Sequence, residues 1–304
     1  MDVRPSDLVL GGGGGRVMLF VLLIVTLFIF CLFFLLIVFI SHRMTKPARN
    51  VEDWTPADLG LGYKEVSFKT EDGIDLKGWW MDKGGEKTLI CLHGYTASRW
   101  RDVYMKPLLK ILKEEDHNVL YFDLRAHGES GGDRTYLGFK EDLDLKASID
   151  WLKGRHEESC EKIGLIGYSM GGIVAVRGLA SDERVDCAVA DSPPIDMDAT
   201  SARSLKYFAG IPGGFYHLIK PTARLLFGIE TLDMYGYAGQ IDKPLLLIAG
   251  KNDPIVKVPE MRKFYEGSGD VVNLWITDAE HVRSIQEDLE EYERRISSFF
   301  EKHL

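Results

Sequence analysis

The chain has 304 residues, of which 45% are hydrophobic and 27% are charged, and its formal net charge is −9. This size predicts one large domain with a short addition and excludes two full domains. The negative charge without a basic face argues against nucleic acid as a partner. No spacing of His, Cys or Glu typical of a zinc site occurs, and we expect neither a metal nor another cofactor.

The chain begins with two segments that are predicted to lie outside the domain. Residues 1–16 include the glycine run 11–15, which predicts a flexible segment, since a phosphate-binding loop would need a preceding strand and a following Lys-Ser/Thr. Residues 17–40 carry no charge and can cross a hydrocarbon core of about 30 Å. This run exceeds the core of a signal peptide, and no cleavage-type site follows it. We therefore expect a retained, single-pass transmembrane helix.

The residues that flank this helix suggest its orientation. Three basic residues follow it and two precede it, an excess that favours a cytoplasmic position for the domain: Arg43, Lys46 and Arg49 against Arg4 and Arg16. The three following residues are also expected to contact lipid headgroups. Residues 41–62 are polar and contain two prolines, which predicts a tether. The four cysteines show no disulfide framework.

The remaining chain, residues 63–304, alternates strand-like and helix-like runs. Residues 63–69 and 76–81 predict an antiparallel pair, and six further strands begin near Thr88, Val119, Ile163, Ala188, Leu245 and Val272. Helices with one apolar face are predicted after Gly138 and at the C-terminus. The pattern predicts an α/β domain with a mostly parallel, doubly wound, eight-stranded sheet.

One stretch, about residues 194–240, departs from strict alternation. It contains two helix-like pieces, 197–209 and 215–227, joined by a Gly- and Pro-rich turn. Its aromatic residues either line an acyl pocket or pack a helix onto the sheet, and the sequence leaves both possibilities open: Phe208, Phe215, Tyr216 and Phe227.

The most informative motif is Gly167-Tyr168-Ser169-Met170-Gly171. It stands between the apolar run 162–166 and the helix-like run 172–176. A serine on a sharp turn from strand to helix crowds its neighbours, so the two glycines meet a steric requirement. The N–H groups at the start of the helix, that of Met170 included, would face an oxyanion formed above Ser169. Ser169 is therefore the predicted nucleophile.

A base and an orienting acid follow Ser169 in the chain. Asp253 follows the apolar strand 244–249, and His281 follows the last predicted strand, 271–276. His281 is the predicted general base and Asp253 its partner. Asp191 also ends an apolar strand and is the alternative acid, whereas His127 precedes the nucleophile and is expected to brace a loop through hydrogen bonds.

The oxyanion also needs a second donor. His93-Gly94-Tyr95 follows the strand-like run 88–92, and Gly94 would allow the N–H of Tyr95 to face the site beside that of Met170. The alternative is that these residues merely end a strand.

These motifs together resemble the α/β-hydrolase superfamily, in particular its short-cap serine esterase and peptidase-like members. The resemblance rests on residues in the family's order: His93-Gly94, Asp123-x-Arg125-x-His127-Gly128-x-Ser130, Gly167-x-Ser169-x-Gly171, Asp253 and His281. It implies the family's fold and makes residues 194–240 the place of the cap. It leaves the substrate open, because the family includes esterases, lipases, thioesterases, amidases, peptidases and inactive scaffolds.

The sequence therefore predicts a membrane-anchored serine hydrolase that cleaves an ester or thioester, with lipid or acylated substrates favoured by its location. A peptidase or amidase acting on small peptides is the alternative enzyme, and a non-catalytic binding protein is the alternative outside enzymes. The oligomeric state stays open.

Overall fold

Eight apolar strands form a single sheet in the order β1-β2-β4-β3-β5-β6-β7-β8. In this computed structural model, which describes residues 12–304, β3 to β8 run parallel and β1 and β2 complete an antiparallel edge. The strands are β1 Lys64–Lys69, β2 Asp75–Met81, β3 Lys87–Leu92, β4 Asn118–Phe122, β5 Lys162–Tyr168, β6 Cys187–Asp191, β7 Leu245–Gly250 and β8 Val272–Thr277. The predicted eight-stranded α/β sheet is confirmed.

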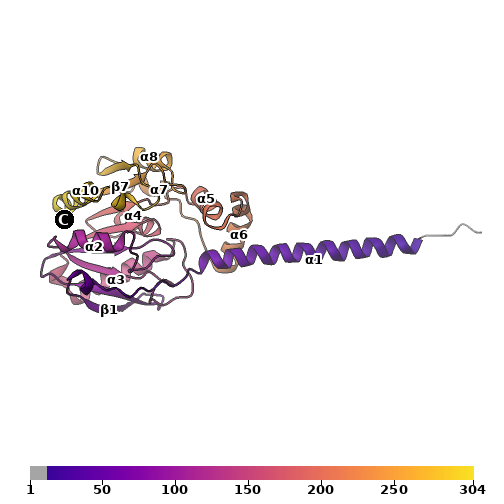
Figure 1. Ribbon diagram of the computed structural model, residues 1–304, viewed down its shortest axis with the longest axis horizontal. Helices are drawn as coiled ribbons and strands as arrows, with labels where there is room; N and C mark the ends of the chain where they lie inside the picture. Colours follow the sequence, from indigo (N-terminus) through magenta and orange to yellow (C-terminus); the bar gives the residue numbers. More distant parts are fainter. Residues whose placement is uncertain (1–11) are drawn as a thin grey trace, which may run out of the picture.

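Helices cover both faces of the sheet, which explains why every residue of β4, β6 and β7 is buried (Figure 1). One face packs against α3 Glu141–Arg155, α4 Met170–Ser181, α7 Tyr235–Ala238 and α8 Val258–Glu266. The other face packs against α2 Met105–Lys113, α9 Ser284–Glu287 and α10 Leu289–His303. The apolar stripes predicted after Gly138 and at the C-terminus are those of α3 and α10.

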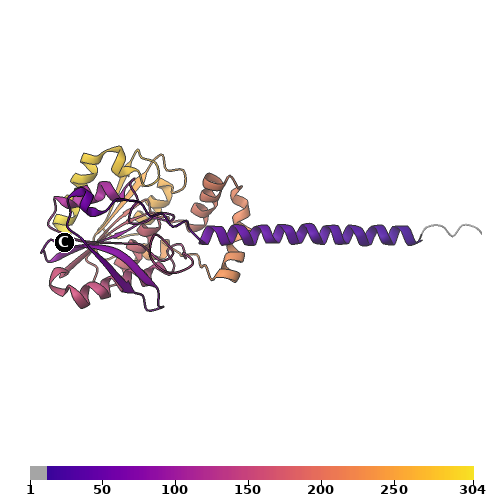
Figure 2. The same ribbon diagram turned by 60° about the horizontal axis from the view of Figure 1, so that its bottom comes forward.

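A long helix, α1 Gly12–Thr45, projects from the domain (Figures 1 and 2). By length and composition alone, the part of this helix from Gly14 to Thr45 could cross a membrane. The flexible segment predicted for residues 1–16 is wrong for residues 12–16, which are helical, and residues 1–11 lie outside the described part of the chain.

The tether predicted for residues 41–62 is also wrong. The helix continues to Thr45, and the following segment packs onto the domain because it carries apolar side chains. Trp54 and Leu61 are buried in the core, and the indole N–H of Trp54 donates to the Trp100 carbonyl at 2.9 Å. A short 3₁₀ helix, Pro56–Leu59, lies between them.

Arg49 was expected to face lipid headgroups, but its guanidinium faces the protein. It donates to the carbonyl oxygens of Gly128 and Gly132, at 3.2 and 2.6 Å, and also to that of Ser130. The domain therefore begins well before residue 63.

The two predicted cap helices are present as α5 Met197–Ala209 and α6 Tyr216–Phe227, joined through a 3₁₀ turn, Gly213–Phe215. The cap packs against the end of α1, where Ile37 of α1 forms a small apolar cluster with Leu205 and Ile219 of the cap.

The four cap aromatics neither line one acyl pocket together nor pack a helix onto the sheet together. Phe208 is 70% exposed, while Phe215 and Phe227 face α1, with ring centroids 6.3 Å from Phe33 and 5.9 Å from His42. Tyr216 lines a small cavity of about 30 Å³, which is bounded by α1, α5, α6, Leu137 and residues 229–231.

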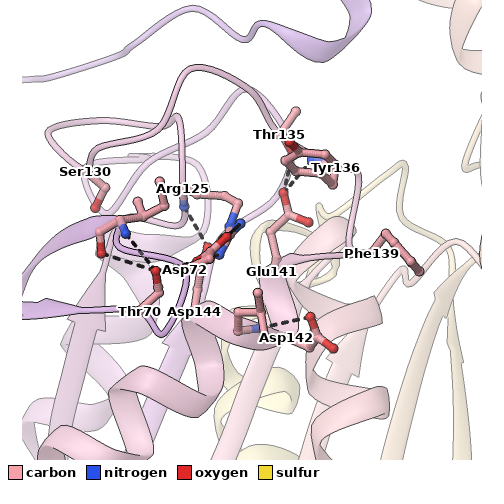
Figure 3. A network of polar contacts seen from close by, with 12 residues as sticks. Thr70, Asp72, Arg125, Ser130, Thr135, Tyr136, Phe139, Glu141, Asp142 and Asp144 are labelled. Carbon is pink, nitrogen blue, oxygen red and sulfur yellow. Dashed lines mark hydrogen bonds and ion pairs between the residues drawn. The ribbon is translucent and has the colours of Figure 1, made fainter. Parts of the chain in front are cut away.

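An ion-pair network around the buried Arg125 fastens the loop after β4 to α3 and to the β1–β2 turn (Figure 3). Arg125, 2% exposed, lies between Asp144 of α3 and Asp72 of the turn. Its side chain donates to Asp144 at 2.8 Å and to Asp72 at 2.8 and 3.1 Å, and its backbone N–H donates to Asp144 at 2.8 Å. The carboxylate of Asp144 is fully buried, so it depends on this single cation.

We expect Arg125→Leu to lower the free energy of unfolding by about 3–5 kcal/mol, because removing one partner leaves a buried charge without compensation. Guanidinium unfolding of the full chain in detergent, followed by tryptophan fluorescence, measures this loss. Lys146→Leu is the matched control, since the Lys146–Glu71 pair lies more than half exposed and contributes little. Equal effects of the two substitutions would contradict the interpretation.

Candidate active site

Ser169 occupies a strained turn between β5 and α4. Its φ of 51° and ψ of −114° fall in a region that residues with a side chain rarely adopt. A Cβ on Gly167 would lie 2.2 Å from the Gly171 carbonyl oxygen, and one on Gly171 would lie 2.2 Å from the Leu92 carbonyl oxygen. The predicted requirement for glycine on both sides of the serine is therefore met by backbone contacts that leave no room for a Cβ.

Ser169, His281 and Asp253 form one chain of hydrogen bonds. The Nε2 atom of His281 lies 2.9 Å from the Ser169 Oγ, and its Nδ1 lies 2.6 Å from Oδ2 of Asp253. Asp253 is 1% exposed, and its Oδ1 accepts the backbone N–H groups of Ile255 and Val256 at 2.8 and 2.9 Å. These two bonds fix the carboxylate so that its other oxygen faces the imidazole.

The loops that carry the acid and the histidine are held together by extension of the β7–β8 pairing. The Lys251 N–H donates to the Thr277 carbonyl at 2.9 Å, and the Asn252 N–H donates to the Ala279 carbonyl at 3.1 Å. A Cβ on Gly250 would lie 2.3 Å from the same Ala279 oxygen. A glycine at this position therefore lets Asp253 reach the loop of His281.

The two predicted oxyanion donors lie at the same end of the sheet. Gly94 borders the serine, since a Cβ there would lie 3.4 Å from the Ser169 Cβ. Met170 is the first residue of α4, so its N–H has no acceptor within the helix. Among residues 12–304, no hydrogen bond uses the N–H of Tyr95 or of Met170. The two N–H groups thus have no acceptor within the described residues.

His127 braces the adjacent loop, as predicted. Its Nε2 accepts the Thr96 N–H at 3.3 Å, and its Nδ1 lies 2.8 Å from the Arg125 carbonyl. Burial lowers the pKa of His127 to about 4, so the ring is neutral and Nε2 can serve as an acceptor. It lies 4.9 Å, centroid to centroid, from the ring of His93, whose pKa burial also lowers.

Comparison with known proteins agrees with this geometry. Residues 87–228 match the family profile of the alpha/beta hydrolase fold. The esterase Pf2001 of Pyrococcus furiosus is 48% identical, with a TM-score of 0.76 and coverage of 84% of this chain and 99% of that one. The chain belongs to the α/β-hydrolase family.

Two further relatives of this α/β hydrolase are more distant. The uncharacterized protein YqkD of Bacillus subtilis (strain 168) is 27% identical over 249 residues, which cover 75% of this chain and 76% of YqkD. The α/β hydrolase GrgF of Penicillium sp. sh18 is 20% identical, with a TM-score of 0.63 and coverage of 80% and 99%, and it shares the fold. The similarity to an esterase supports hydrolase activity.

Three residues around the site of the hydrolase were not predicted from its sequence. The Tyr104 hydroxyl accepts the Gly94 N–H at 3.0 Å, and the Thr135 hydroxyl lies 3.4 Å from the Met170 sulfur. The Ser192 hydroxyl accepts the Val282 N–H at 3.3 Å, next to His281. Tyr104 and Thr135 lie in irregular segments, where no periodicity marks a residue. The positive φ of Ser192, 54°, is visible only in the structure.

Within residues 12–304, no group of three or more His, Cys, Asp or Glu side chains could hold a metal ion. All four cysteines are free, and Cys91, Cys160 and Cys187 are buried.

Asp191, the alternative acid, is fully buried and does not hydrogen-bond to His281. Its carboxyl oxygens accept the hydroxyl groups of Ser192 at 2.9 Å and Tyr292 at 3.3 Å. Burial raises the pKa of Asp191 to about 7, because water no longer stabilises the charged form. The structure thus separates two neighbouring acids, one bonded to the histidine and one that keeps its proton up to about neutral pH.

We expect Asp191→Asn to stabilise the hydrolase at high pH but not at low pH. Between its ordinary pKa of 3.8 and about 7, the folded protein keeps a proton that the unfolded chain releases, so stability falls as pH rises. Asn imitates the protonated acid and does not titrate. The difference in melting temperature between variant and wild type should therefore increase from about pH 4 to about pH 8. A difference independent of pH would show that Asp191 is charged throughout.

Proposed function

We propose that this hydrolase is a membrane-anchored serine hydrolase that cleaves an ester or thioester through an acyl-enzyme on Ser169. The observation that carries the proposal is the continuous hydrogen-bonded chain from Ser169 through His281 to Asp253. The 48% identical relative Pf2001 is an esterase, which supports acyl transfer as the reaction class.

In the first half-reaction, the Ser169 Oγ attacks the substrate carbonyl carbon while His281 Nε2 accepts the serine proton. The carbonyl oxygen becomes an oxyanion, which the N–H groups of Tyr95 and Met170 stabilise, at about 3 to 4 kcal/mol for each donor. Asp253 holds the imidazole with its Nδ1 proton directed to the carboxylate and stabilises the imidazolium that forms. His281 then gives its proton to the departing alcohol or thiol, and the acyl group stays on Ser169.

In the second half-reaction, water takes the place of the leaving group. His281 removes a proton from water as the water oxygen attacks the acyl carbon, and the same two N–H groups stabilise the second oxyanion. Collapse of this intermediate returns the proton to Ser169 and releases the carboxylic acid. The residues named supply the nucleophile, the base and the electrostatic stabilisation, so the cycle as proposed requires neither metal nor cofactor.

We further propose that α1 anchors the enzyme in a bilayer as a single span, with the domain on the cytoplasmic side. The composition of α1 supports the anchor, since its residues from Val17 to Leu36 are uncharged and exposed on all sides of the helix. The basic residues after the span, Arg43 and Lys46, support the orientation. An active site held beside a bilayer favours lipids or acylated molecules as substrates, because tethering raises their effective concentration.

Ser169→Ala should abolish both hydrolysis of p-nitrophenyl acyl esters and covalent labelling by a fluorophosphonate probe, because no other group can form the acyl-enzyme. In-gel fluorescence of the labelled full chain measures the second effect. Ser181→Ala, on the same helix but at its exposed end, is the control and should label like the wild type. Labelling of the Ser169 variant at the wild-type level would refute the assignment.

Asp253→Asn should lower kcat on the same esters by about 10⁴, because the imidazole then takes the wrong tautomer. Asp191→Asn, by contrast, should stay within about tenfold of the wild type, since it leaves the His281–Asp253 bond in place. Steady-state kinetics on the two variants make the comparison. The opposite ranking would transfer the orienting role to Asp191.

A further inference from the structure

The cap carries an apolar surface that nothing in the described chain covers. Outside α1, eight large hydrophobic residues among residues 12–304 are exposed, and five of them lie on α5 and α6. We call these five the cap surface: Tyr207, Phe208, Leu218, Leu225 and Leu226. Phe208 and Leu225 are 70% and 84% exposed. Such a concentration on two short helices marks an interaction surface.

The sequence of α6 gives it two apolar faces. Ile219 and Ala223, four residues apart, are buried and form the face toward α1 and the cap interior. Leu218, Pro221 and Leu225 follow each other at intervals of three and four residues and are all exposed. A surface helix that faces water normally carries polar residues on the face opposite its buried one.

The position of the cap relative to α1 indicates what covers this surface. The rings of Phe33 and Phe215 lie 6.3 Å apart, so the cap reaches the level of Phe33 on α1. With a rise of 1.5 Å per residue, residues 17–36 already cross a hydrocarbon core of about 30 Å, and Phe33 lies within it. A span shifted toward Ile40 places Phe33 still deeper, about 10 Å from the end of the uncharged run.

The packing of α1 against the cap fixes the position of the cap along α1. Ile37 is 3% exposed between Leu205 and Ile219, and the Ser41 hydroxyl donates to the carbonyls of Ile37 and Ile219. In both ribbon views the cap lies at the end of the domain from which α1 emerges (Figures 1 and 2). A bilayer that contains α1 therefore meets the cap.

We propose that the cap surface is embedded in the interface of the bilayer that α1 spans, with the leucines of α6 and the aromatic end of α5 among the lipid chains. This inference rests on the membrane anchoring proposed above and deepens it. An amphipathic helix buries its apolar face about 5–10 Å into the boundary of headgroups and acyl chains, a depth consistent with the level of Phe33. The neighbouring Lys206 and the hydroxyl end of Tyr207 suit the headgroup region.

Embedding of the cap also bears on where substrate enters. The cap, α1 and Leu137 surround the small cavity lined by Tyr216. Leu137 lies two residues after Thr135, whose hydroxyl contacts Met170 of the active site. An acylated lipid in the same leaflet would thus lie next to the cap and need not pass through water.

Fluorescence quenching on the full chain in vesicles of phosphatidylcholine and phosphatidylglycerol tests the proposal. Cys31 is exposed in α1 and is first replaced by Ser, while the other three thiols are buried. Single cysteines are then introduced as Phe208→Cys and Leu225→Cys and labelled with the fluorophore NBD. Leu289→Cys, at the exposed first residue of α10, is the aqueous control, and Phe28→Cys in α1 is the membrane control.

We expect the probes at positions 208 and 225 to emit at shorter wavelength than the probe at 289. Spin-labelled phosphatidylcholine should quench them, and iodide should not. If they respond like the probe at 289 while the probe at 28 is quenched by lipid, α1 is anchored but the cap inference is wrong.

Two other results also overturn the inference. Protection at 208 and 225 from both quenchers would mean that a protein, a second copy of the chain included, covers the cap surface. Failure of spin-labelled lipid to quench the probe at 28 would refute the anchoring itself.

Discussion

The site depends above all on the parallel pairing of β5 to β8, which brings four strand ends to one edge of the sheet. The pairing continues past the strands themselves: the Ser169 N–H donates to the Asp191 carbonyl at 2.8 Å, and the Ser192 N–H donates to the Ile248 carbonyl at 2.8 Å. The β7–β8 ladder likewise extends through Asn252 to Ala279. Residues as far apart in the chain as Ser169 and His281 meet because each follows its strand in register with its neighbours.

This arrangement explains why two buried acids at one sheet edge differ in their chemistry. Asp253 is held by two backbone N–H groups and bonds to the imidazole. Asp191 receives only hydroxyl donors in a fully buried position, and burial raises its pKa to about 7. Through Ser192, Asp191 also contacts the backbone beside His281. Asp191 thus supports the loop that carries His281. A protonated, neutral acid can do this without placing a second negative charge beside Asp253.

The helix α1 is a structural part of the domain as well as a candidate anchor. Its last residue, Thr45, accepts the Thr135 N–H through its carbonyl at 3.0 Å. Glu141 of α3 holds the same loop by accepting from Thr135 and from the N–H groups of Tyr136 and Gly138 (Figure 3). Because Thr135 also contacts Met170, the end of α1 lies only two contacts from the serine turn. The placement of α1 on the domain and the geometry of the site are thereby linked.

The sequence by itself determined the strands, the two cap helices, the serine turn and the candidate acid and base, because apolar periodicity and glycine spacing are local properties of the chain. The tertiary structure alone decided that Arg49 binds domain carbonyls, that Trp54 belongs to the core, and that Phe215 and Phe227 face α1. It also decided between Asp253 and Asp191 as the hydrogen-bond partner of His281. These outcomes depend on contacts between segments distant in sequence, whose partners no local pattern can specify.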